Sequence, residues 1–354
     1  MKYYQQRGMT LIEIMISLLI GTFLIGGIIQ IFLTTNQTYR TQENLSRMQE
    51  NGRFAMEFLT KDIRMAGYNG CGTKNATLAN TLNNSATSWE INFNQPIQGF
   101  NNVASTLSIF NRAPIAGTDA ITILSANGDD ACVIASHNPT AASVHCEDNH
   151  DLKQGEILLI SNCSHAAVFQ MSNVNNNNTI SVVDHNTGSG TNPGNCTKGL
   201  GVPVPSPCTA NGTSYEFEDG SIRRQKAIGY FIATGVNAQP ALFRATLNSA
   251  SEITAGNARV ISNELIEGVE NMQILYGVDG IDSDNSVDYY VSANQVTDMN
   301  KVVSIRISLL IRSIDGNVTS TPRAYTYNGA TTTPTDNRLR RVFSSTIAVR
   351  NRLP

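Results

Sequence analysis

Apolar positions are concentrated in one continuous stretch near the N-terminus, residues 9–33, which carries a single charged residue, Glu13. About 20 apolar residues in a helix, with a rise of about 1.5 Å each, cross the hydrocarbon core of a bilayer. The stretch therefore predicts a transmembrane helix over residues 9–33. A short polar segment with Lys2 and Arg7 precedes it, and positive charges of this kind favour the cytoplasmic side.

The polar segment ends at Gly8, and this position bears on how the chain is processed. A secretory signal peptide has a shorter apolar core that is followed by a cleavage site of small residues. Here the small residue precedes the apolar core. We therefore predict cleavage between Gly8 and Met9, which removes residues 1–8 as a leader peptide and leaves the helix on the mature protein.

The pattern changes from uniformly apolar to amphipathic over residues 34–66. Small and apolar residues recur at three- and four-residue spacing, which indicates one face of a helix. They are Leu45, Met48, Gly52, Ala55, Leu59, Ile63 and Ala66. Gly67 ends the pattern, as is typical of a helix C-terminus. The prediction is one continuous rod through both segments, about 85 Å long.

Beyond Gly67 the long helical period stops, and short runs of strand type alternate with turn residues. The predicted strands are Ser88–Phe93, Ala120–Leu124, Glu156–Ile160, Val168–Met171, Thr179–Val183, Ala227–Ile232, Leu242–Ala245, Glu270–Tyr276, Val302–Arg312 and Arg341–Val349. We predict long loops at 70–87 and 184–214, and a turn or flexible tip at Asn175–Asn178. The predicted fold class is α+β, a long N-terminal α-helix packed on a large antiparallel β-rich head. This head, residues 67–354, is either one domain or two subdomains divided near residue 214.

The net charge bears on nucleic-acid binding, and the cysteines indicate the cellular compartment of the head. The formal net charge of −3 gives no basic balance that would indicate nucleic acid. All six cysteines follow the apolar stretch and are expected in the periplasm, where disulfides persist. Cys132–Cys146 and Cys196–Cys208 are the nearest pairs in the sequence, which leaves Cys71 for Cys163. Six cysteines allow many other pairings, so the connectivity stays open.

Motifs for catalysis are absent from the sequence, which has no nucleophile elbow, Walker loop, HExxH or CxxC. We therefore predict no enzymatic activity. Residues 145–151 group metal-ligand residue types without regular zinc spacing, which favours a polar loop over a metal site. The other histidines, His137, His165 and His185, are scattered, and we expect them at the surface or in loops.

An acidic segment offers one possible metal site. Four carboxylates, Asp279, Asp282, Asp284 and Asp288, fall between two predicted strands. Hard oxygen ligands at short spacing suit calcium, although the spacing is not that of an EF-hand. The alternative is a solvated turn, because Asp, Asn, Gly and Ser are turn residues. Calcium is the only cofactor that the sequence suggests.

Glu13 is a carboxylate inside a membrane helix, which costs about 2.5–3.5 kcal/mol or more when it is unpaired. Cleavage after Gly8 would create a cationic amine at Met9, one helical turn away. We expect that amine, from the same or a neighbouring subunit, to neutralise Glu13.

The segment from Arg7 to Glu13, RGMTLIE, resembles the class III signal of type IV pilins and type II secretion pseudopilins. In that family a prepilin peptidase cuts after the glycine and N-methylates the new amine. The fifth mature residue is a glutamate. The resemblance implies processing at Gly8 and Met9, N-methylation of Met9, and an assembly role for Glu13. Met9 replaces the usual phenylalanine.

Segments in the rest of the chain resemble PilW-type minor pilins. They are Arg53–Ala55, Asp62–Tyr68, Leu159–Cys163, Ala167–Gln170, Gly268–Glu270, Leu275–Asp279, Arg341–Phe343 and Arg350–Arg352. The resemblance implies a role in type IV pilus assembly, in a tip or initiation complex, with motility or adhesion downstream. A minor pseudopilin of a type II secretion system is the alternative. A membrane-tethered adhesin or periplasmic enzyme is an alternative of another class.

The same resemblance implies partners and a location. The partners are the prepilin peptidase, other minor pilins and the major pilin through the N-terminal helix, the inner-membrane assembly platform, and a tip adhesin. The location is a single-pass inner-membrane protein with a cytoplasmic N-terminus and a periplasmic head, and then the pilus at the cell surface. The head exceeds the usual domain size of about 100–150 residues. Repeated along a shaft it would clash with its neighbours, which favours the tip.

Overall fold

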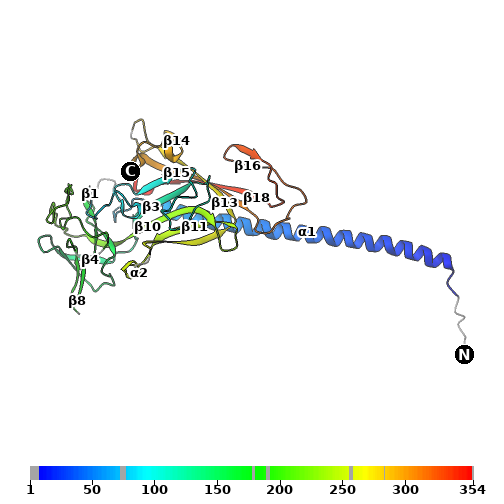
Figure 1. The fold of residues 1–354 in the computed structure, drawn as a ribbon, viewed down its shortest axis with the longest axis horizontal. Helices are drawn as coiled ribbons and strands as arrows, with labels where there is room; N and C mark the ends of the chain where they lie inside the picture. The colour runs from blue at the N-terminus through cyan, green and yellow to red at the C-terminus, as the bar shows by residue number, and fades with distance from the viewer. Residues whose placement is uncertain are drawn as a thin grey trace, which may run out of the picture.

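The computed structural model describes residues 8–71, 77–177, 180–188, 192–254, 258–282 and 284–352; the other residues of the expected leader, 1–7, lie outside this range. One long helix, α1 (Leu11–Arg64), runs from the N-terminus into a β-rich head (Figure 1). The head packs along the C-terminal half of α1, and the N-terminal half projects from it. The predicted α+β fold is therefore confirmed.

The head consists of strands β1 to β18 with one short helix, α2 (Ala250–Thr254). The strands are β1 (Thr77–Asn80), β2 (Ile97–Phe100), β3 (Ala120–Ala126), β4 (Cys132–Asn138), β5 (Ser143–Cys146), β6 (Ile157–Ser161), β7 (His165–Gln170), β8 (Asn173–Asn177), β9 (Ile180–Asp184), β10 (Ser221–Thr234), β11 (Pro240–Leu247), β12 (Val260–Glu267), β13 (Val269–Val278), β14 (Tyr289–Val291), β15 (Val302–Arg312), β16 (Tyr325–Tyr327), β17 (Ala330–Thr332) and β18 (Arg340–Ala348). Short 3₁₀ turns occur at Trp89–Ile91, Ala293–Gln295, Met299–Lys301 and Arg350–Arg352.

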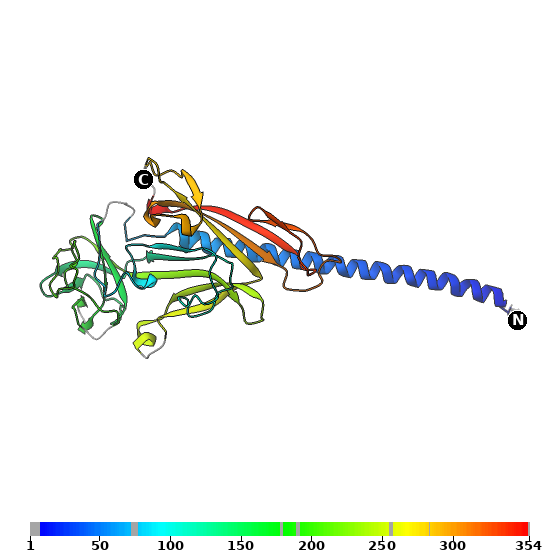
Figure 2. The same ribbon diagram turned by 45° about the horizontal axis from the view of Figure 1, so that its top comes forward.

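Strand β10 is shared by two parts of the largest sheet. Its first residues, 221–224, pair with β4 and β6, and residues 225–234 pair with β3 and β11. We call β1 and β4–β9 the distal part of the head, because Figure 2 places them at the end away from the N-terminus of the chain. Strands β2, β3, β11 and β12 form the proximal part, beside α1. The described strand pairs are antiparallel except β1 with β7.

A second sheet, in the order β14-β13-β15-β18, lies along the other side of α1 (Figure 2). The helix packs between the two sheets, because its buried residues share one core with both. That core includes Leu59 and Ile63 of α1, Tyr230 and Ile232 of β10, and Ile307 of β15. Burial of this apolar face stabilises the helix more than propensity alone does.

The predicted helix face is confirmed apart from Leu45. Met48, Gly52, Ala55, Leu59 and Ile63 are buried in α1, whereas Leu45 is 38% exposed. The neighbouring residue Asn44 is buried instead, and its side-chain amide donates a hydrogen bond to Asp315 Oδ2 at 3.0 Å. At Asn44 the helix therefore contacts the head through a polar side chain, and a pattern of apolar residues does not predict this contact.

Strand Val302–Arg312 forms β15 with the predicted bounds, and its alternate residues Ile305, Ile307, Leu309 and Ile311 enter the core. The strand predicted at Ser88–Phe93 is wrong. Trp89–Ile91 form a 3₁₀ turn there and do not pair with a strand. Their apolar side chains pack into a core that also contains residues of β3 and β10. An apolar run of this length does not distinguish the two outcomes.

Two predictions of irregular structure were also wrong in part. The predicted loop 70–87 contains β1, which pairs with β7. Most of the turn predicted at Asn175–Asn178 belongs to β8, which pairs with β9. Backbone hydrogen bonds form these ladders whatever the side chain, so asparagine does not exclude them. Residues 178 and 179 lie outside the described residues.

Three disulfides join parts of the head, Cys71–Cys163, Cys132–Cys146 and Cys196–Cys208. Cys132–Cys146 and Cys196–Cys208 are the pairs that sequence proximity favoured, and Cys71–Cys163 is the pair that remained. The first ties the segment after α1 to the β6–β7 turn, 92 positions away in the sequence. The distal part is therefore covalently connected to the end of the helix.

Candidate functional site

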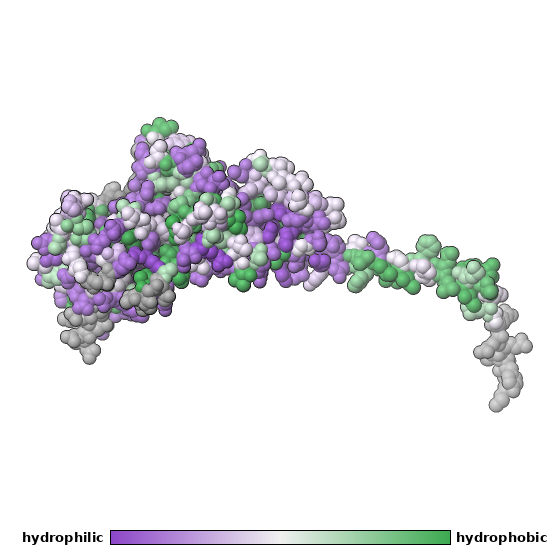
Figure 3. Space-filling view, viewed as in Figure 1, coloured by the Kyte–Doolittle hydropathy of each residue, from purple (hydrophilic) through white to green (hydrophobic). Residues whose placement is uncertain are grey.

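The N-terminal half of α1 presents its apolar side chains to the surroundings. Leu11 is 76% exposed and Phe23 is 77% exposed. Figure 3 shows this hydrophobic segment projecting from a largely polar head. Within the described ranges, α1 is the one helix long and apolar enough to cross a membrane. This segment offers its whole circumference to lipid or to other helices.

A capping box closes the N-terminus of α1. Thr10 Oγ1 accepts a hydrogen bond from Glu13 N at 3.4 Å, while Thr10 N donates to Glu13 Oε2 at 2.9 Å. Gly8 and Met9 precede the helix and are exposed, so the predicted cleavage site lies on accessible, non-helical chain. Sequence reasoning did not find the role of Thr10, although T-x-x-E is the signal of a capping box.

A polar clasp, residues 313–319 after β15, holds α1 close to the projecting segment. Gln37 Nε2 and Thr41 Oγ1 both donate to the Val318 carbonyl, the latter at 3.1 Å. Asn44 donates to the clasp residue Asp315. The clasp fixes where the head begins along the helix, and no sequence signal pointed to it.

The last turn of α1 is held by a buried carboxylate. Asp62, 4% exposed, accepts hydrogen bonds from Lys226 Nζ at 2.8 Å, Tyr230 Oη at 2.6 Å and Arg244 Nη2 at 2.9 Å. Burial acts to raise the pKa of Asp62, but the Lys226 and Tyr230 hydrogen bonds and the Lys226 and Arg244 charges outweigh it and lower the pKa. The carboxylate therefore stays ionised and links the helix to β10 and β11.

Two histidines expected at the surface or in loops are buried together in the distal part. His137 is 5% exposed and His185 fully buried, with 3.2 Å between their Nε2 atoms. Phe217 N donates to His137 Nδ1 at 3.1 Å, so the His137 proton sits on Nε2 and points to His185. Burial lowers the pKa of His137 to about 4 and that of His185 to about 3. The pair is neutral and structural.

The acidic segment lies between β13 and β14. The structure brings together Asp279, Asp282 and Asp288, and one carboxylate oxygen of each lies within 4.8 Å of the other two. Asp284 is outside this group, and its Oδ1 accepts from Ser286 N at 2.7 Å. Asp288 Oδ2 accepts from the backbone N–H groups of residues 280 and 281, both at 2.8 Å. Three of the four residues predicted to bind calcium thus form a cluster.

The segment 145–151 does not form such a cluster among the described residues. Cys146 is oxidised in a disulfide with Cys132, and Asp151 pairs with Arg224 at 2.7 Å. Two potential metal ligands of this segment, Cys146 and Asp151, are therefore already engaged in a disulfide and in an ion pair.

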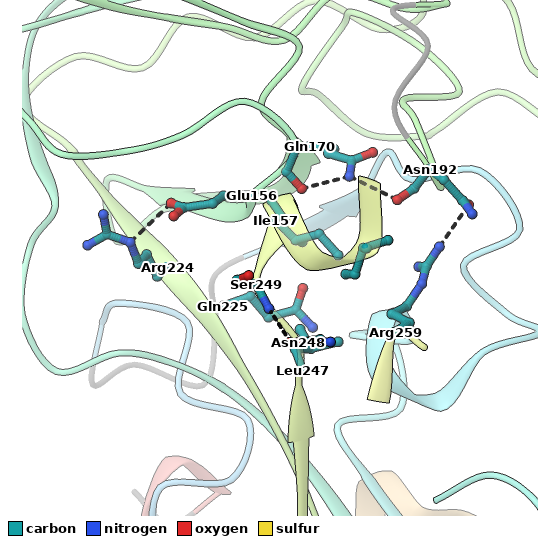
Figure 4. Close-up of a pocket in the computed structure, with 13 residues that line it drawn as sticks. Glu156, Ile157, Gln170, Asn192, Arg224, Gln225, Leu247, Asn248, Ser249 and Arg259 are labelled. Carbon is teal, nitrogen blue, oxygen red and sulfur yellow. Dashed lines mark hydrogen bonds and ion pairs between the residues drawn. The ribbon is translucent and has the colours of Figure 1, made fainter. Parts of the chain in front are cut away.

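A cavity of about 340 Å³ lies between β6, β10 and the α2 region (Figure 4). Its polar side chains bond to one another: Arg224 Nε donates to Glu156 at 3.0 Å, and Arg259 Nη2 donates to Asn192 at 2.7 Å. Among the described lining residues there is no histidine, cysteine or lysine, and Glu156 is its one acid. These two hydrogen bonds link the chain segments that surround the cavity.

Comparisons with known proteins agree at both ends of the chain. Residues 229–351 match the model of the Type IV Pilus-assembly protein W (PilW) family. Residues 4–29 match the prokaryotic N-terminal methylation motif. A search of curated proteins and a search of solved structures each found no match. The two family matches confirm the resemblance of this chain to PilW-type minor pilins of the type IV pilus system.

Proposed function

We propose that the protein is a minor pilin that acts in a tip or initiation complex of a type IV pilus, together with other minor pilins. The observation that carries this proposal is the place of the distal part of the head. In Figures 1 and 2 the distal part lies beyond the C-terminal end of α1, on the side away from the N-terminus. The head is therefore extended along the direction of the rod.

This extension bears on where the subunit fits. Filament subunits with parallel helices have another subunit above each head, so a head extended along the rod would meet that neighbour. At the tip the space above is open. The exposed segment of α1 still packs with pilin helices below, and so the subunit primes assembly of the shaft. A free upper surface also suits presentation of an adhesin, with motility or adhesion as the downstream role.

Processing and membrane insertion follow from the same proposal. The prepilin peptidase cuts between Gly8 and Met9 and N-methylates Met9, and residues 9–33 span the inner membrane with the N-terminus cytoplasmic. The assembly platform then moves the subunit into the pilus. Mass spectrometry of the N-terminus of membrane-extracted protein tests this step. An intact Met1, or a cut after residue 33, would refute the pilin proposal.

Placement at the tip is tested by deletion and by labelling. Deleting the gene should reduce the number of pili while the major pilin is still expressed. An epitope placed in the exposed segment 320–324, beyond the clasp, should be detected at filament ends only. Label along the whole shaft, near the stoichiometry of the major pilin, contradicts the placement. Normal pili with lost type II secretion would assign the subunit to a pseudopilus.

A further inference from the structure

We propose that Asp279, Asp282 and Asp288 bind a calcium ion that fixes the β13–β14 turn to the four-stranded sheet. This site is independent of the helix-mediated assembly proposed above. It is built from residues at the end of one strand and before the next, with Val278 ending β13 and Tyr289 beginning β14. The turn forms an outer corner of the head (Figure 1).

The spacing of the carboxylates fits one shared cation. Their oxygens lie within 4.8 Å of one another, and calcium binds oxygen ligands at about 2.3–2.6 Å. Two ligands on opposite sides of one ion are therefore about 5 Å apart at most. One oxygen from each of the three carboxylates is therefore close enough to share a single cation.

Burial of one carboxylate supplies a second, independent observation. Asp279 is 5% exposed, and its Oδ2 accepts from Asn285 N at 3.0 Å. Its Oδ1 is buried and has no hydrogen-bond partner among the described residues. A buried anionic oxygen without a partner is unfavourable. None of the three carboxylates forms an ion pair with a described residue. A bound cation would supply the missing partner to Asp279 and offset the repulsion among the three.

The chemistry of the ligands selects calcium among common cations. All three groups are hard oxygen donors, whereas zinc favours histidine and cysteine. Asp282 and Asp288 are exposed, so water can complete the coordination shell. Calcium accepts such irregular shells, while magnesium demands near-octahedral geometry. A site with three carboxylates on the outside of a cell suits the affinity range of extracellular modules, about 10⁻⁴–10⁻³ M.

The test uses the full-length processed protein in detergent, titrated with calcium chloride by calorimetry and melted with calcium or with chelator. We expect binding at submillimolar to millimolar concentration and a melting temperature that rises with added calcium, since a ligand stabilises the state that binds it. Asp282→Asn should weaken calcium binding at least about tenfold, because affinity follows the number of ligand charges. The matched control in the same loop is Asp284→Asn, which should bind like the wild type.

A second variant separates the ion from general effects on folding. Asp279→Asn removes the buried charge and keeps an acceptor for Asn285 N. It should abolish the calcium-dependent rise in melting temperature without lowering the melting temperature in chelator. The proposal is overturned if calcium gives no binding heat and the same melt as chelator. It is also overturned if magnesium stabilises equally, or if Asp284→Asn loses as much affinity as Asp282→Asn.

Discussion

Asp62 and Tyr230 lie 168 positions apart in the sequence, and their side chains form a 2.6 Å hydrogen bond in the buried end of α1. Burial and the nearby Asp62 charge raise the pKa of Tyr230, so its hydroxyl stays protonated and donates. The bond connects the rod to the strand that runs through both parts of the large sheet. Through β10, the end of the helix is thereby connected to the distal part of the head.

Replacing Asp62 tests this connection. Asp62→Asn leaves Lys226 and Arg244 without their counter-charge, and breaking a buried pair costs about 3–5 kcal/mol. The two cations are 33% and 27% exposed, so solvent reduces the loss. We expect the free energy of unfolding to fall by about 2–3 kcal/mol in denaturant titration. Tyr230→Phe should cost about 1 kcal/mol, the net contribution of one hydrogen bond. Equal losses for both variants would contradict the ion-pair role.

Gly52 tests how closely β18 approaches the helix. A Cβ at Gly52 would overlap the ring of Phe343, with Cζ as its nearest atom. Gly52→Ala should destabilise the head by about 1–2 kcal/mol, because overpacking outweighs the gain in helix propensity. Ser46→Ala, on the exposed face of the same helix, should change stability by less than about 0.5 kcal/mol. Denaturant titration of each variant measures the difference.

A double variant shows whether the aromatic ring is the cause of that loss. Phe343→Leu removes the ring atoms that the new Cβ would meet, so it should reduce the cost of Gly52→Ala. If Gly52→Ala costs the same in the wild type and in the Phe343→Leu background, the close approach of the ring is not the cause.

The buried histidines predict a loss of stability in mild acid. Their folded pKa values, about 4 for His137 and about 3 for His185, lie below the unfolded value of about 6.5. The unfolded state therefore binds more protons as pH falls below about 6.5, so stability is lost in that direction. We expect a decrease of about 1–3 kcal/mol per pH unit between about pH 6 and pH 4.

A double variant provides the control, through the slope of its stability against pH. His137→Gln combined with His185→Gln should flatten the dependence between about pH 6 and pH 4, whatever its effect at neutral pH. A wild-type melting temperature that is constant from about pH 7 to about pH 4.5 would exclude the proposed linkage.

The disulfides predict unequal effects of removal. Cys71–Cys163 closes 92 positions and Cys196–Cys208 closes 12. Chain entropy assigns about 4–5 kcal/mol to the first and about 3 kcal/mol to the second. The Cys71→Ser, Cys163→Ser variant should therefore melt at a lower temperature than the Cys196→Ser, Cys208→Ser variant. Non-reducing peptide mapping of the wild type should find both bonds; a different connectivity would refute the framework.

The sequence predicted elements whose signals are local. The apolar stretch and the three- and four-residue spacing predicted α1, and strict alternation predicted β15, because one face of each must be buried. Contacts between distant segments carry no such signal. Nothing in the sequence near Gly52 indicates Phe343, and nothing near Asp62 indicates Lys226. Hydrophobic periodicity indicates which face of a helix or strand is buried, but it does not indicate which residues cover that face.

The candidate sites also differ in whether their residues are close together or far apart in the sequence. The RGMTLIE segment lies within one short stretch of chain, so its pattern was complete in the sequence. The acidic segment was visible as four carboxylates, but only the backbone of the turn brings three of them together and leaves Asp284 apart. The histidine pair was missed, because residues 48 positions apart in the sequence meet in the fold. The T-x-x-E signal of Thr10 was local and should have been found.

Glu13 has two possible roles, and the structure allows them to be separated. Its Oε2 accepts from both N and Oγ1 of Thr10, each at 2.9 Å, so it caps its own helix. After cleavage, the expected charge pairing would join this carboxylate to the Met9 amine of the same or a neighbouring subunit. Glu13→Gln keeps a side-chain acceptor for the cap but removes the charge. Thr10→Ala removes the hydroxyl of the cap, at about 0.5–2 kcal/mol, and keeps the charge.

If charge pairing governs assembly, Glu13→Gln and Glu13→Ala should both remain in the membrane and both fail to enter pili. The apolar span is unchanged or strengthened in each, since an unpaired carboxylate opposes insertion by about 2.5–3.5 kcal/mol. Thr10→Ala should assemble like the wild type. Membrane fractionation and pilus counts measure both steps. Normal piliation with Glu13→Gln would leave capping as the only role, because the loss of charge would then have no effect on neighbouring subunits.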